Sequence, residues 1–252
     1  MSFEGPPTKT EMPIVQLLPN LVTLAAICAG LTAIRFGFQG QFSTAVLLIL
    51  AACVLDGIDG RLARLLNCES PMGAELDSLA DFLNFGVATP ILIYLFTLQD
   101  MPKAGWFAVL LFSVCCVIRL ARFNVGKKTD IDAKNGKYFV GVPAPAGAML
   151  ILLPLFLSFL DDEGAHLPNE VIFVWMATVG VLMICRIPTY SFIFMTVSRD
   201  NVKYFLLGFA CVVSALLNYL WLTLSIVAAA YFVSFLWAWL SSWRRAADLA
   251  RQ

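Results

Sequence analysis

The sequence is poor in charged residues, which occupy 13% of its 252 positions, compared with about 25% in an average soluble domain. It contains one histidine, His166, and its acidic and basic residues are equal in number. A chain without net positive charge lacks the electrostatic attraction that drives nucleic-acid binding, so we expect no nucleic-acid partner. Hydrophobic residues make up 60% of the chain, and no polar stretch as long as a soluble domain interrupts them. The composition therefore indicates an integral membrane protein.

The cysteines also lack the spacing of a metal or disulfide framework. The seven are Cys28, Cys53, Cys68, Cys115, Cys116, Cys185 and Cys211. They form no C-x-x-C pair, and nearly all lie inside apolar runs. Neither a zinc site nor a disulfide scaffold is suggested, and we interpret the cysteines as small apolar packing residues.

The apolar runs predict an all-α polytopic bundle of about eight transmembrane helices. Each run is long enough to cross a hydrocarbon core of roughly 30 Å. We expect the helices at about residues 17–36, 42–66, 73–98, 104–125, 142–160, 170–186, 204–220 and 222–243.

The positive charges predict the orientation of this bundle. With the spans above, every Lys and Arg except Arg35 and Lys103 falls on one side of the membrane. The positive-inside rule makes that side cytoplasmic, and both termini then lie there. Residues 1–16 contain no basic stretch that leads directly into an apolar run, so we expect a retained cytoplasmic segment and not a cleaved signal.

Four aspartates stand out in the second and third predicted spans. Asp56 and Asp59 are three residues apart, and Asp77 and Asp81 are four apart, so each pair lies on one helix face. The connection between the spans is short, so the helices are antiparallel neighbours and the two faces can meet. A carboxylate at membrane depth costs about 2.5–3.5 kcal/mol on insertion scales, which favours a polar cavity with counter-charges.

Arg61 and Arg64 neutralise only part of this negative charge, and bound divalent metal would supply the rest. Oxygen ligands alone favour hard ions such as magnesium, manganese or calcium, and two-metal sites suit phosphoryl substrates. The small residues on the same faces leave room for a bulky ligand; they are Gly57, Gly60, Ala63 and Gly73. Structural ion pairs between helices are the alternative interpretation, and a cation transporter that uses the aspartates as an ion path is another.

The spacing of these residues resembles the signature of the CDP-alcohol phosphotransferase family. The stretch reads Asp56-x-x-Asp59-Gly60-x-x-Ala63-Arg64, then eight residues, then Gly73-x-x-x-Asp77-x-x-x-Asp81. The resemblance implies that the four aspartates bind two divalent ions, Mg²⁺ or Mn²⁺, which hold the diphosphate of a CDP-lipid. It also implies that Asp81 is the base that takes the proton from the incoming hydroxyl.

The resemblance implies further contacts to the CDP-lipid. Gly60, Ala63, Arg64, Ser70 and Gly73 would lie around the nucleotide diphosphate, together with Asp56. Asn20 and Thr23, in the segment Pro19-Asn20-x-x-Thr23, would help to hold the cytidine. Helix capping is an equally good explanation for Asn20.

Three other segments are similar to the bacterial, membrane-embedded branch of the family that makes phosphatidylserine. They are Arg119-Leu-Ala-Arg122-Phe-Asn124, Gly141-Val-Pro-Ala-Pro-Ala146 and Arg186-Ile-Pro-Thr-Tyr-Ser191. The branch implies CDP-diacylglycerol and L-serine as substrates, with phosphatidylserine and CMP as products. Arg119, Arg122 and Asn124 are then candidates for binding serine, because a guanidinium recognises a carboxylate. Positive-inside topology alone would also explain the two arginines.

The resemblance extends over most of residues 13–200 and suggests a division of the chain. Residues 1–16 form a cytoplasmic segment, 17–200 the catalytic membrane core, and 201–252 two further transmembrane helices with a short basic tail. It also implies a homodimer in the bacterial inner membrane with the active site facing the cytoplasm. Within the family, glycerol phosphate, inositol phosphate or another alcohol remains an alternative acceptor.

Overall fold

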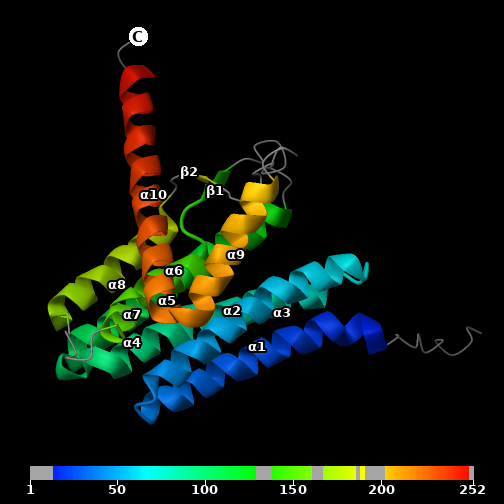
Figure 1. Ribbon diagram of the computed structural model, residues 1–252, viewed down its shortest axis with the longest axis horizontal. Coiled ribbons are helices and arrows are strands. Elements are labelled where there is room, and N and C mark those ends of the chain that lie inside the picture. Colours follow the sequence, from blue (N-terminus) through cyan, green and yellow to red (C-terminus); the bar gives the residue numbers. More distant parts are fainter. Residues whose placement is uncertain (1–13, 129–137, 161–166, 186–187, 191–201, 250–252) are drawn as a thin grey trace, which may run out of the picture.

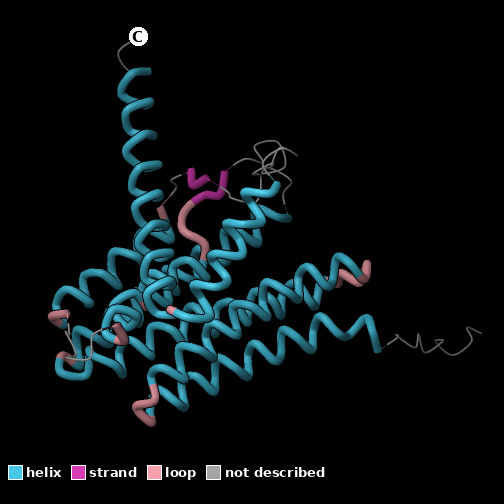
Figure 2. Tube along the Cα trace, in the orientation of Figure 1, coloured by secondary structure: helices cyan, strands magenta, loops and turns pink. Residues whose placement is uncertain are grey.

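The computed structural model describes residues 14–128, 138–160, 167–185, 188–190 and 202–249, and these are almost entirely helical (Figures 1 and 2). The α-helices are α1 (Ile14–Phe38), α2 (Phe42–Leu65), α3 (Pro71–Asp81), α4 (Thr89–Thr97), α5 (Pro102–Lys128), α6 (Ala144–Ile151), α7 (Leu153–Ser158), α8 (Asn169–Ile184), α9 (Val202–Asn218) and α10 (Leu220–Leu249). A π-helix, η1 (Phe82–Ala88), joins α3 to α4, and a 3₁₀ turn, η2 (Leu98–Asp100), follows α4.

The prediction of an all-α polytopic membrane protein is confirmed. Five helical stretches of the described chain are long and apolar enough to cross a membrane: Leu17–Phe38, Phe42–Leu65, Pro71–Asp100, Pro102–Val125 and Leu220–Trp239. Three shorter apolar helical stretches cover Ala144–Ser158, Asn169–Ile184 and Val202–Asn218. Each of the eight predicted spans thus corresponds to a helical stretch, while the number that cross the membrane and the side of the termini stay predictions. Residues 1–13 and 250–252 lie outside the described residues.

Two of the predicted spans are broken by proline, and each break is compensated by another helix. Pro154 has no N–H to donate to the carbonyl of Leu150, four residues earlier, and α6 gives way to α7 at that point. The indole Nε1 of Trp175 on α8 donates to this same Leu150 carbonyl at 2.8 Å. The unpaired backbone acceptor that the proline creates is therefore satisfied inside the bundle.

The third predicted span contains the π-helix η1, directly after Asp81. Pro90 cannot donate to the carbonyl of Gly86, and the hydroxyl of Ser113 on α5 donates to it at 2.6 Å. The Thr89 hydroxyl donates to the Asn84 carbonyl at 2.8 Å. π-Helical segments occur frequently at functional sites, and here the segment separates the half of the span that carries Asp77 and Asp81 from an apolar half.

A short antiparallel ladder was not predicted from the sequence. Strand β1 (Tyr138–Val140) pairs with β2 (Pro188–Tyr190), with Phe139 opposite Thr189. The ladder lies beyond the ends of α5 and α8, and its strands belong to the two segments that lead into α6 and away from α8 (Figure 1). It joins two parts of the chain that are about fifty residues apart in sequence.

The core lies where η1 meets the surrounding helices. α1 packs along α2, α5 packs along α8, and η1 contacts α1, α2, α3, α4, α5 and α6. Phe85 of η1, Phe112 of α5 and Phe156 of α7 are among the largest fully buried side chains. α9 buries none of its residues, and α10 packs on α6, α7 and α9 while its C-terminal half extends away from the bundle (Figure 1). The first three helices and α5 therefore surround the polar site described next.

Candidate functional site

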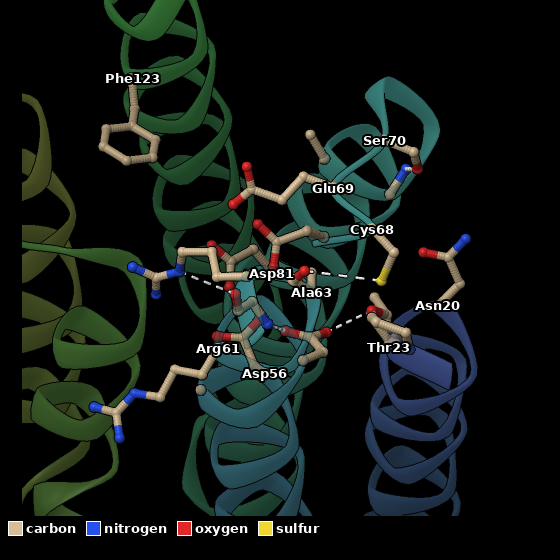
Figure 3. Close-up of a pocket in the computed structure, with 18 residues that line it drawn as sticks. Asn20, Thr23, Asp56, Arg61, Ala63, Cys68, Glu69, Ser70, Asp81 and Phe123 are labelled. Carbon is tan, nitrogen blue, oxygen red and sulfur yellow. Dashed lines mark hydrogen bonds between the residues drawn. The ribbon is translucent and has the colours of Figure 1, made fainter. Parts of the chain in front are cut away.

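The four predicted aspartates line one cavity of about 750 Å³. α1, α2, α3 and the connection between α2 and α3 form its walls, and Phe123 of α5 closes one side. Figure 3 shows Asn20 and Thr23 on α1 at one side, Phe123 at the other, and Asp56 and Asp81 between them. The two acidic helix faces therefore meet, as their spacing predicted.

Asp59 is held firmly by neighbouring groups. Its side chain is 3% exposed, and the Thr23 hydroxyl donates a hydrogen bond to its carboxylate. The N–H of Gly60 donates to the other carboxylate oxygen at 2.6 Å. The Thr23 hydroxyl also lies 3.1 Å from the carbonyl of Pro19, within hydrogen-bonding distance. Thr23, which we predicted to contact cytidine, therefore orients an aspartate of the cluster.

Asp56 and Asp81 are less completely paired. Their carboxyl groups, from α2 and α3, approach closely enough to interact directly, and Asp77 adds a third negative charge nearby. One oxygen of Asp56 and one of Asp81 are buried without a hydrogen-bond partner in the described part of the chain. Buried acceptor oxygens without donors are costly unless a cation or another ligand occupies the space beside them.

The donor chemistry of this cluster suits a hard divalent cation. Every candidate ligand is a carboxylate oxygen, and two of those oxygens have no other partner among the described residues. A Cβ at Gly57 or Gly60 would meet nothing within 4 Å, so both helix positions leave open space beside the acids. Within the described residues, however, no three His, Cys, Asp or Glu side chains form a ready-made metal-binding group. Coordination would then need side-chain adjustment or ligand oxygens from a substrate.

Three of the predicted donor-binding residues gather at the start of α3. Ser70 is its N-cap and accepts a hydrogen bond from the Gly73 N–H at 3.0 Å. A Cβ at Gly73 would lie 3.0 Å from the side-chain oxygen of Asn20 and 3.1 Å from the Ser70 hydroxyl. A larger residue here would therefore press against Asn20 and Ser70, where α1 approaches α3. Asn20, Ser70 and Gly73 all line the cavity.

The other predicted donor-binding residues lie along α2. Gly60, Ala63 and Arg64 all line the cavity. The Arg64 Nε donates to the Gly60 carbonyl at 3.1 Å, and its guanidinium is exposed. Arg61, which the signature does not specify, also lines the cavity, and its side chain points away from α1 (Figure 3). Two positive side chains therefore stand beside the acidic cluster.

The predicted acceptor-binding residues near the end of α5 do not line this cavity, and each has a different environment. Arg119 is 8% exposed, and its guanidinium lies 5.5 Å from the ring centre of Phe123. Arg122 donates to the carbonyls of Ile184 at 2.8 Å and Met183 at 3.4 Å. Asn124 donates to the Ser78 hydroxyl at 3.0 Å.

Other residues at the site were not predicted from the sequence. Cys68 and Glu69 line the cavity from the connection between the two aspartate pairs, and Phe123 does so from α5. Ser78 follows Asp77 and bonds to Asn124. The first two could have been suspected because they lie inside the spacing of the signature. Phe123 and Ser78 depend on how α5 packs against α3, which the sequence alone does not specify.

Comparison with known proteins supplies the remaining observations. The pattern of the CDP-alcohol phosphatidyltransferase family matches residues 16–184. The chain is 46% identical over 175 residues to the CDP-diacylglycerol--serine O-phosphatidyltransferase of Mycobacterium leprae, covering 69% of this chain and 58% of that protein. It is 43% identical over 175 residues to the protein of that name from Mycobacterium tuberculosis, covering 69% and 61%.

A more distant relative has a similar length. The Helicobacter pylori (strain ATCC 700392 / 26695) protein of the same name is 37% identical over 183 residues, covering 70% of this chain and 73% of the relative. The chain thus spans about three fifths of the mycobacterial relatives. All four aspartates, α5 and α8 lie inside the region that the family pattern matches.

Proposed function

The chain belongs to the CDP-alcohol phosphatidyltransferase family, and we propose that it transfers the phosphatidyl group of CDP-diacylglycerol to L-serine. The products are phosphatidylserine and CMP. The observation that carries this proposal is the cavity in which two pairs of aspartates from α2 and α3 converge beside Arg61 and Arg64. Relatives that bear the name of this activity support serine as the acceptor.

The donor occupies the part of the cavity between α1, α2 and α3. Asp56, Asp59, Asp77 and Asp81 would hold two divalent ions, Mg²⁺ or Mn²⁺, and these ions would neutralise and polarise the diphosphate. Thr23 and the Gly60 N–H fix the orientation of Asp59. The open space at Gly57 and Gly60 allows the diphosphate to approach the backbone of α2.

The same position of the donor indicates which residues surround its nucleotide. Asn20 and Ser70 present polar side chains beside Gly73, next to the acidic cluster. Arg64 binds a phosphate oxygen, since a guanidinium matches phosphate geometry. Ala63 leaves space on the same face of α2. The cytidine therefore lies toward α1, and the reacting phosphorus lies toward Asp81.

The chemical step is a direct displacement. The serine hydroxyl oxygen forms a bond to the phosphorus that carries the diacylglycerol, and the bond from that phosphorus to the CMP oxygen breaks with its electron pair. Asp81 accepts the hydroxyl proton, a role that typically contributes 10²–10⁴-fold to the rate. The acceptor approaches from the side of the cavity where α5 carries Phe123, near Arg119, Arg122 and Asn124.

We also propose the division of the chain into a segment 1–16, a catalytic core 17–200 and an additional pair of helices within 201–252. The protein lies in the bacterial inner membrane with the cavity open to the cytoplasm, and it works as a homodimer. The apolar helices and the concentration of positive charge beside the aspartates support this orientation.

The decisive experiment uses the full chain purified in detergent, with CDP-diacylglycerol, Mg²⁺ or Mn²⁺, and radiolabelled L-serine. We expect serine-dependent release of CMP together with labelled phosphatidylserine, and loss of both when the metal is chelated. A parallel panel with glycerol phosphate and inositol phosphate tests the alternative acceptors. CMP release with one of these and none with serine would refute serine as the acceptor, while metal transport into liposomes without CMP release would refute the enzyme.

A further inference from the structure

The end of α5 presents three polar side chains within two turns, and their hydrogen bonds separate them into two kinds. Arg122 and Asn124 bond to other helices, whereas Arg119 makes no hydrogen bond or ion pair with another described residue. From this difference we propose that Arg119 binds the carboxylate of the acceptor and that Arg122 and Asn124 are positioning residues. This inference rests on the proposed function, because it assumes an acceptor with a carboxylate.

The Arg122 side chain is hydrogen-bonded to the C-terminal end of α8. The last carbonyls of a helix have no donor within the helix and carry the negative end of its dipole. Arg122 donates to two of them, Ile184 at 2.8 Å and Met183 at 3.4 Å. Gly141, before α6, lies against the same end of α8. It has φ +83°, and a Cβ there would lie 2.8 Å from the Met183 carbonyl oxygen, so this position requires glycine. Arg122 therefore fastens α5 to α8.

Asn124 fastens α5 to α3 in the same way. Its amide donates to the Ser78 hydroxyl at 3.0 Å, and that hydroxyl lies 3.3 Å from the Asn124 side-chain oxygen. Ser78 directly follows Asp77 on α3. The pair thus fixes the distance between the acidic helix and the helix that carries Phe123, which lines the cavity on the side opposite Asn20 (Figure 3).

Arg119 is buried but has no anionic partner within the described residues. Its side chain is 8% exposed, and its guanidinium lies 5.5 Å from the ring centre of Phe123. Its charge interacts with that of Asp81 without the two forming an ion pair. Leaving a buried cation unpaired is strongly unfavourable, so this guanidinium is suited to an anion that enters with a ligand.

Arg119 lies near Phe123 and within electrostatic reach of Asp81, and this position would also orient the acceptor. In serine, two carbon atoms separate the carboxyl carbon from the hydroxyl oxygen. A carboxylate bound at Arg119 therefore leaves the hydroxyl free to turn toward Asp81, the proposed base. Ethanolamine, which is serine without its carboxylate, would lose this contact and should be a poor acceptor.

The test compares Arg119→Gln, Arg122→Gln and Asn124→Ala in the full-length protein, with Arg35→Gln as the matched control. Arg35 is an exposed arginine in the last turn of α1 and contributes to no part of the site. The readouts are the KM for L-serine, kcat, binding of CDP-diacylglycerol, and the melting temperature in detergent. Ethanolamine is the comparison acceptor.

For Arg119→Gln we expect the KM for serine to rise roughly ten- to hundredfold, the effect of losing a hydrogen bond to a charged group. The melting temperature and donor binding should stay as in wild type, and the preference for serine over ethanolamine should shrink by a similar factor. Arg119→Lys, which keeps the charge, should recover part of the loss.

For Arg122→Gln and Asn124→Ala we expect a lower melting temperature, and any loss of activity should appear in kcat with less than about a threefold change in the KM for serine. Arg122→Lys should restore stability, since a lysine also donates to helix carbonyls. An unchanged serine KM in Arg119→Gln, or a large KM increase without loss of stability in Arg122→Gln, would overturn the assignment. Failure of the proposed function looks different, because wild-type protein would then release no CMP on addition of serine.

Discussion

The contact between Gly30 and Asn84 allows a quantitative test of how α1 is set against the third span. Both residues are buried, and the Asn84 side chain is fully buried with neither amide atom hydrogen-bonded in the described residues. A Cβ at Gly30 would overlap the Asn84 side-chain oxygen and lie 3.0 Å from its Cγ and 3.4 Å from the Leu83 Cδ2. The close approach of α1 to η1 thus requires glycine.

We therefore predict that Gly30→Ala destabilises the protein. Inserting an atom into a filled core costs about 1–3 kcal/mol, and the direct overlap with a buried amide favours the upper end, about 3 kcal/mol. Replacing a helical glycine by alanine also stabilises the folded state by up to about 1 kcal/mol, because the unfolded chain loses conformational freedom. The net loss is about 2 kcal/mol, which lowers the melting temperature of a chain of this size by roughly 4–8 °C.

The assay is thermal unfolding in detergent, followed by circular dichroism. Gly208→Ala is the matched control, because a Cβ there meets nothing within 4 Å and the residue lies on exposed α9. The control should be neutral or slightly stabilising. In an Asn84→Ala background the effect of Gly30→Ala should largely disappear, because the overlapping amide is gone. If Gly30→Ala behaved like Gly208→Ala in the wild-type background, the contact would not fix the helix separation.

The remaining predictions concern the cavity. Asp59→Ala should abolish phosphatidylserine formation at saturating Mg²⁺, whereas Asp81→Asn should lower kcat while CDP-diacylglycerol binding, measured by calorimetry, stays nearly unchanged. Thr23→Val removes the hydrogen bond to the Asp59 carboxylate. It should raise the Mg²⁺ concentration needed for half-maximal activity roughly 10–100-fold, while Thr23→Ser should keep most of the wild-type metal affinity. Gly60→Val fills open cavity space and should weaken donor binding without lowering the melting temperature, so a folded variant with normal donor affinity would contradict the proposed donor position.

Much of this architecture could be predicted from the sequence, because hydrophobicity and helical spacing are local properties. The apolar runs located all eight helical stretches, and the intervals between Asp56, Asp59, Asp77 and Asp81 correctly predicted that the acids share one cavity. The roles of individual residues depend on tertiary contacts and were less accessible. No local pattern links Thr23 to Asp59, thirty-six residues away.

The end of α5 illustrates the same limit. Its positive charges could be explained equally well by topology and by acceptor binding, and sequence spacing treats Arg119 and Arg122 alike. The difference between them arises because α8 ends beside Arg122, and because β1 and β2 bring the neighbouring chain to the same place. The hydropathy of the sequence predicts neither the pairing of β1 with β2 nor the packing of the end of α8 against α5.

The prolines within the predicted spans show how tertiary structure supplies what the local sequence lacks. Pro90 and Pro154 each deprive a carbonyl four residues earlier of its helical donor. In a bilayer such an acceptor cannot turn to water, so a donor from the protein must replace it. Ser113 donates to Gly86 and Trp175 donates to Leu150, each across a helix interface. The Ser113 bond allows the third span to change its helical geometry directly after Asp81, so the polar half of that span can face α2 while its apolar half packs in the core.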